Sequence, residues 1–142
     1  MPRPDFSPQS TNTYSAETQG VRVDVRVDYC PDQSDPDVPR HVWAYTITIA
    51  NLGPQAVQLH SRHWIITDER GRTEEVKGLG VVGQQPVILP GGSHEYTSGC
   101  PLNAPSGVMH GRFLMIGADG TRFEAKVPAF SLDLPYTRKT LN

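Results

Sequence analysis

Apolar and polar residues alternate along much of the chain. The clearest stretch is 21–28, where four valines alternate with two arginines and two aspartates. Successive side chains on a strand point to opposite faces, so this period of two predicts a strand with one buried face and one solvated face. Residues 41–50 repeat the pattern, with Trp43, Tyr45, Ile47 and Ile49 on one face.

Shorter alternating runs predict further strands, separated by segments rich in turn residues. The strands span 56–67, 73–76, 86–89, 94–98, 108–116 and 123–127, with 130–134 extending the last. The turns fall at 51–54, 68–71, 90–92 and 119–120. No segment keeps apolar residues at helical spacing. About seven or eight short strands predict an all-β fold, an antiparallel β-sandwich, with a small barrel as the alternative.

The 142 residues fit one domain with polar ends. Residues 1–19 are rich in Pro, Ser, Thr and Gln and are predicted to be a flexible N-terminal tail. The domain is predicted to span 20–135, and 136–142 a flexible C-terminal tail.

Charge and hydropathy indicate which classes of partner are disfavoured and in which cellular compartment the protein is expected. The net charge of −2 disfavours binding to nucleic acid or to an anionic membrane. Apolar runs reach only three or four residues, and the N-terminus has no apolar stretch of signal-peptide length. We therefore expect a cytoplasmic protein without membrane contact, in which Cys30 and Cys100 are reduced thiols.

Five segments carry a family resemblance, in this order along the chain: 44–49, 61–68, 78–86, 96–102 and 128–132. Together they resemble the bacterial ApaG family over about 20–135. The resemblance implies an immunoglobulin-like or fibronectin type III-like sandwich and a bacterial cytoplasmic protein. The family is linked by name to cobalt and magnesium efflux or resistance, and related eukaryotic domains are protein-interaction modules.

The segment 78–83 contains the pattern GxGxxG through Gly78, Gly80 and Gly83. In dinucleotide-binding domains this pattern leads into a helix whose N-terminus holds the pyrophosphate. Here Pro86 follows closely and no helical period appears, so a Rossmann-type site is excluded. Two interpretations remain: a tight bend with Val81 and Val82 packed inward, or a nest of backbone N–H groups that binds phosphate or a nucleotide.

Arg62 is the candidate cation for that phosphate site, provided that the fold brings it to the glycines. On a regular strand it shares a face with His60 and Trp64, whereas His63 points to the opposite face. This spacing disfavours a metal site shared by His60 and His63 unless the strand bulges. The alternative role for Arg62 is packing at the sheet edge.

Other chemistry finds little support in the sequence. His and Cys do not occur at the spacing of a zinc site, and Glu74 and Glu75 are expected to be solvated. Whether the protein binds a metal ion stays unknown. Neither Ser98 nor Cys100 lies in a nucleophile motif, so no catalytic residue and no cofactor is predicted. We expect a non-enzymatic module that binds an unidentified protein partner, with phosphate or nucleotide binding at Gly78, Gly80, Gly83 and Arg62 as the alternative. An indirect role in cobalt and magnesium homeostasis is a further alternative, and the oligomeric state is open.

Overall fold

The computed structural model describes residues 13–35, 37 and 39–134, and nearly all of them lie in or between β-strands. One turn of 3-10 helix, η3 (Pro31–Gln33), follows the second strand. The strands are β1 (Thr13–Thr18), β2 (Val21–Tyr29), β3 (His41–Asn51), β4 (Val57–Asp68), β5 (Thr73–Leu79), β6 (Val87–Ile88), β7 (Ser93–Leu102), β8 (Ser106–Gly117) and β9 (Arg122–Asp133).

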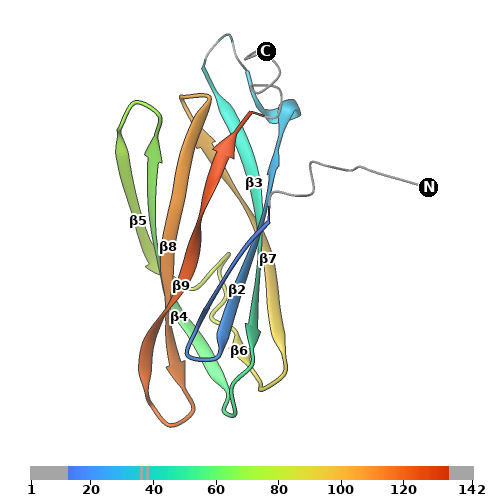
Figure 1. The fold of residues 1–142 in the computed structure, drawn as a ribbon, viewed down its shortest axis with the longest axis vertical. Helices are drawn as coiled ribbons and strands as arrows, with labels where there is room; N and C mark the ends of the chain where they lie inside the picture. Colours follow the sequence, from blue (N-terminus) through green and yellow to red (C-terminus); the bar gives the residue numbers. More distant parts are fainter. Residues whose placement is uncertain (1–12, 36, 38, 135–142) are drawn as a thin grey trace, which may run out of the picture.

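These strands form two sheets (Figure 1). One sheet has the order β1-β2-β3-β7 and the other the order β5-β4-β8-β9, with the short β6 also pairing with β4. Every pairing is antiparallel. The predicted antiparallel sandwich is therefore confirmed, with nine strands in the described part of the chain instead of seven or eight.

The core lies between the sheets and follows the predicted alternation. The four valines of β2 are buried, and so are Trp43, Ile47 and Ile49 of β3. The opposite sheet contributes side chains such as Phe113 and Met115 of β8. Each fully buried side chain of this size contributes about 1.5–3 kcal/mol relative to an exposed one, so the alternating strands account for much of the stability.

The N-terminal boundary of the domain differs from the prediction. Residues 13–18, assigned to a flexible tail, form β1 and pair with β2. Tyr14 lies against Phe130 with ring centroids 6.1 Å apart, and its hydroxyl accepts a hydrogen bond from the Ser131 N–H at 3.3 Å. Ser, Thr and Glu alternate here with half-buried residues, so the polar composition hid the period of two. The rest of that predicted tail, and the predicted tail at 136–142, lie outside the described residues.

Strand β4 is central in its sheet and is irregular at one position. Its pairing with β8 shifts register between Leu59 and Ser61, which is a bulge at His60. Leu59 and Trp64 are both buried although they are five positions apart, an odd spacing that would put them on opposite faces of a regular strand, because the bulge resets the alternation. The strand therefore turns its side chains differently on the two sides of His60.

Candidate functional site

The glycine segment, residues 78–83, begins at the end of β5 and leads toward β6, and both of these strands pair with β4. Its tip is a tight turn in which Val81 and Gln84 exchange backbone hydrogen bonds of 2.8 and 3.0 Å. The two central residues have positive φ angles, 47° at Val82 and 76° at Gly83. Positive φ at both positions defines a type I′ turn, which suits the right-handed twist of a hairpin. The segment is therefore a bend in an all-β domain.

Gly80 has a steric role in this bend. Its φ is 64°, and a Cβ there would collide with the Gln84 carbonyl oxygen. Its N–H donates to the His60 carbonyl at 2.9 Å, which ties the segment to the bulge of β4. Gly83 differs, because a Cβ there would meet nothing within 4 Å and only its positive φ favours glycine.

Arg62 does reach the glycine segment, as the phosphate hypothesis required. It pairs across the strands with Gly78, whose missing side chain leaves room for the guanidinium about 3 Å from the site of a Cβ. The Nη1 group donates to the carbonyl oxygens of Leu79 at 3.0 Å and Gly80 at 2.8 Å. The Arg62 guanidinium therefore binds carbonyl oxygens of the glycine segment.

These contacts reduce the donors that the segment offers to an anion. The N–H groups of Gly80, Val81 and Gln84 already donate to backbone carbonyls of the chain. Arg62 lies on carbonyl oxygens, which carry partial negative charge and repel phosphate. The arrangement is what a structural bend requires. Phosphate binding at Gly78, Gly80, Gly83 and Arg62 stays a prediction, with fewer donors than the sequence suggested.

The two valines of the turn, Val81 and Val82, differ in exposure to solvent. Val81 is buried as predicted, at 1% exposure. The tight-bend interpretation placed Val82 inward as well, but its side chain is 65% exposed, because Val82 occupies a central position of the type I′ turn. The prediction treated the two as equivalent. The sequence gives no sign that the turn falls between them.

His60 and His63 both line a hollow of about 550 Å³ on the outer side of the β5-β4-β8 sheet. The bulge at His60 thus overturns the regular spacing that placed them on opposite faces. His63 lies 2.7 Å from Glu75, and this hydrogen bond lowers the pKa of Glu75. The buried Nδ1 atom of His60 has no partner among the described residues. The other residues that line the hollow are Ser61, Arg62, Lys77, Gly78, Leu79, Arg112, Leu114 and Glu124.

Buried polar groups also lie between the sheets. Burial raises the pKa of the Tyr45 and Tyr96 hydroxyls, and the positive charge of Arg62 acts against this on both. The Tyr96 hydroxyl is buried and has no partner in the described part of the chain. Burial raises the pKa of Cys100 to about 11, so this thiol is protonated at neutral pH and is no activated nucleophile.

Neither a metal centre nor a membrane span emerges from the described residues. No three His, Cys, Asp or Glu side chains in 13–35, 37 and 39–134 gather closely enough to hold a metal ion. In the same part of the chain, no helix is long and apolar enough to cross a bilayer. Cys30 and Cys100 are both free thiols.

Exposed apolar side chains concentrate within the glycine segment and in the residues that follow it. Four large aliphatic side chains within 79–89 are 59–67% exposed: Leu79, Val82, Val87 and Leu89. On the outer face of the sheet, Leu79 and Leu114 both pair with Ser61, while Val87 and Ile116 both pair with Gln58. Cross-strand partners share a face, so these aliphatic side chains form two adjacent rows. We call residues 79–89 the apolar segment.

This surface was not predicted from the alternation of side chains, although the sequence carries a signal of it. Glycine and proline interrupt residues 79–89, so this stretch cannot form a strand long enough to bury all of its apolar side chains. The pairing of Arg62 with Gly78 was also accessible. If Thr67 and Thr73, the facing ends of the two predicted strands, are paired, counting back along the strands places Arg62 and Gly78 opposite each other.

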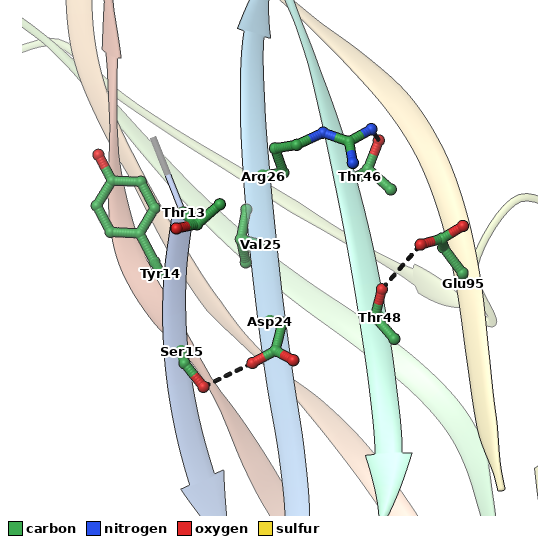
Figure 2. A pocket seen from close by; sticks show the side chains of 9 residues that line it. All are labelled: Thr13, Tyr14, Ser15, Asp24, Val25, Arg26, Thr46, Thr48 and Glu95. Carbon is green, nitrogen blue, oxygen red and sulfur yellow. Dashed lines mark hydrogen bonds between the residues drawn. The ribbon is translucent and has the colours of Figure 1, made fainter. Parts of the chain in front are cut away.

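The outer face of the other sheet has a different character. Its side chains form a polar ladder in which Ser15 bonds to Asp24 at 2.6 Å and Thr48 bonds to Glu95 at 3.0 Å (Figure 2). Arg26 reaches Thr46 at 3.4 Å in the same shallow hollow of about 400 Å³. These groups bond to one another, so among the described residues this face shows no unpaired cluster that suggests chemistry.

Comparison with known proteins gives one consistent family. The model of the ApaG domain matches residues 31–117. The protein ApaG of Brucella suis biovar 1 is 54% identical over 129 residues, which cover 91% of this chain and 99% of that protein. A crystal structure of a Bordetella pertussis protein named ApaA superposes with a TM-score of 0.80 at 50% identity, covering 82% of this chain and 95% of that one. The predicted resemblance is confirmed.

Proposed function

The chain belongs to the ApaG domain family, and from this premise we propose that it is a non-enzymatic module that binds a protein partner through the apolar segment. The observation that carries the proposal is the exposure of the segment. Of the six large hydrophobic side chains that are strongly exposed in the described residues, four lie within these eleven positions. Clustered exposed apolar surface is typical of interaction sites, whereas scattered single residues are not.

Backbone strain at Val82 supports the same surface. A β-branched residue with positive φ is a rare conformation that costs roughly 1–3 kcal/mol, and Asn or Gly is the usual residue there. Val82 is nevertheless 65% exposed, so the chain gains no burial in return. A strained residue with an outward apolar side chain is accounted for when a partner covers it.

The charges beside the apolar segment suggest what the partner carries. Lys77 lies on the neighbouring strand β5 and forms no ion pair within the described residues. Arg112 lies in the same cross-strand row, opposite His63, and has one exposed carboxylate partner, Glu124, at 3.2 Å. The fitting partner therefore presents apolar side chains flanked by acidic ones.

Crosslinking inside cells tests the proposal at a single position. A photoreactive amino acid replaces Val82 in one variant and Leu52, another exposed aliphatic residue in a turn, in the control. We expect position 82 to give a discrete crosslinked product with another protein and position 52 to give none. Absence of a product from position 82, or the same product from both positions, would contradict the proposal.

A further inference from the structure

The edges of the two sheets are protected unequally. On β9, the N–H of Lys126 donates to Thr18 at 3.1 Å and that of Ser131 donates to Tyr14, so β1 covers this edge. On β5, Arg62 occupies the Leu79 carbonyl. The same strand carries Glu74, Glu75 and Lys77, and charged side chains discourage edge pairing.

The first sheet has two edges, β1, which lies against β9, and β7. The backbone of β7 can be oriented from its first hydrogen bonds. The Gly91 N–H donates to the Asn51 carbonyl at 2.8 Å, and the Asn51 N–H donates to Gly92 at 3.0 Å. This is a bulge that fixes residues 51 and 92 as a hydrogen-bonded pair. Alternation along the register then turns the backbone nitrogen and C=O groups of Ser93, Glu95, Thr97, Gly99 and Pro101 away from β3.

Pro101 agrees with this orientation. Proline has no N–H to donate, so it fits an edge strand only where its nitrogen faces away from the neighbouring strand. The outward backbone groups of the central residues are also unused. Among the described residues, no turn, loop or side-chain hydrogen bond reaches the backbone N–H or C=O of Glu95, Thr97 or Gly99. The strand therefore offers an open row of donors and acceptors.

The side chains of β7 leave that row accessible. Glu95 carries the only charge on the strand, and its carboxylate accepts a hydrogen bond from Thr48 on the outer face (Figure 2). Gly99 has no positive φ, and a Cβ there would meet only the Trp43 carbonyl at an ordinary 3.7 Å. Packing inside the chain thus does not require this glycine. Without a side chain at position 99, nothing crowds this end of the row on the outer face.

We propose that β7 is a pairing edge for a second copy of this chain, with the two β7 strands antiparallel about a two-fold axis at Thr97. This register engages every outward position from Ser93 to Pro101. It places Thr97 opposite its own copy, a favourable cross-strand pair, and Glu95 opposite the glycine at position 99. An axis at Glu95 would instead oppose two carboxylates. Two four-stranded sheets would become one continuous sheet.

The contact is small, so the association belongs to the weak class of interfaces, with a dissociation constant on the order of 100 μM. Analytical ultracentrifugation of the full chain measures it directly. We expect the weight-average mass to rise from monomer toward dimer between roughly 10 μM and 1 mM. A monomer at every concentration would overturn the proposal, including the case in which β7 binds an extended segment of a different protein.

Thr97→Pro locates the contact. Because the N–H of residue 97 points away from β3, the variant loses no hydrogen bond of the β3–β7 ladder, yet it removes a donor at the proposed axis. Thr97→Val is the control, since both variants lose the hydroxyl bond to Thr46. We expect Thr97→Pro to weaken dimerisation at least tenfold and Thr97→Val to leave it within about twofold.

Two charge variants keep the test decisive if the proline variant does not fold. Gly99→Lys places a cation opposite Glu95 of the second copy, and Gly99→Glu places a like charge there. We expect the first to tighten dimerisation and the second to weaken it, with the difference shrinking in high salt. A dimer that responds equally to both variants forms through another surface, which would overturn the proposal.

Discussion

At the scale of single residues, the glycines of the 78–83 segment have separate physical roles. Gly78 leaves room for the Arg62 guanidinium, Gly80 avoids a collision with Gln84, and Gly83 supplies a positive φ. The GxGxxG spacing thus arises from a cross-strand contact, a bend and a turn. Its similarity to a nucleotide motif does not require a shared ligand.

Substitution of two of these glycines should separate the roles. Gly80→Ala faces a backbone collision in addition to its positive φ, so we expect a loss of about 2–3 kcal/mol in the free energy of unfolding. Gly83→Ala is the matched control, because only the φ angle is unfavourable there, and we expect about 1 kcal/mol. Urea unfolding measures both, and equal losses would refute the assigned roles.

The two cysteines should differ in reactivity. Burial raises the pKa of Cys100 to about 11, with a smaller contribution from the charge of Glu74, whereas Cys30 is half-exposed. We expect a thiol reagent at pH 8 to label Cys30 in the native protein and Cys100 only after unfolding, as read by mass spectrometry. Equal labelling rates would contradict the burial of Cys100.

The raised pKa of Cys100 has a consequence for stability. Its pKa is higher in the folded state than the ordinary value of 9.0 for a cysteine thiol, so unfolding releases a proton at alkaline pH. The contribution is fully present below pH 9 and is lost as the pH rises from 9 toward 11. Substitution Cys100→Ala should flatten the stability profile in this window while leaving its shape at neutral pH unchanged.

At the scale of strands, alternation of side chains predicted the core well. Val23 of β2 and Ile47 of β3 are buried because a period of two has one physical meaning on a sheet that is covered on one side. The same rule failed at His60, since a bulge inserts one residue without a mark in the sequence. It also failed at β1, where the inward side of the pattern is only half-buried.

Strand β1 should contribute to stability despite its polar composition. Tyr14 packs on Phe130 and accepts a hydrogen bond from β9, so we expect Tyr14→Ala to cost about 2–4 kcal/mol of unfolding free energy. Glu17→Ala on the exposed side of the same strand is the control and should change little. A neutral Tyr14→Ala variant would support the flexible tail that the sequence suggested.

At the scale of the molecule, the sandwich has two contrasting outer faces and two kinds of edge. The outer face of β1-β2-β3-β7 is a ladder of mutually bonded polar groups. The other sheet carries the apolar segment on its β4 side. The apolar residues of 79–89 are visible in the sequence, but their gathering on one face depends on which strands become neighbours. The family was recognisable from ordered motifs, while the surface required the fold.

In the proposed complex, a partner covers Val82 and so offsets the cost of its unfavourable backbone conformation. Substitution Val82→Asn places a residue that favours type I′ turns at the same position and removes the apolar side chain. Unfolding and partner binding can both be measured on this variant, with Leu52→Asn as the control for loss of an exposed aliphatic side chain.

We predict that Val82→Asn gains about 1 kcal/mol in unfolding free energy while its affinity for the crosslinked partner falls at least tenfold, and that Leu52→Asn binds as the unmodified chain does. A Val82→Asn variant that is more stable and binds its partner undiminished would contradict the proposed role of Val82 in binding.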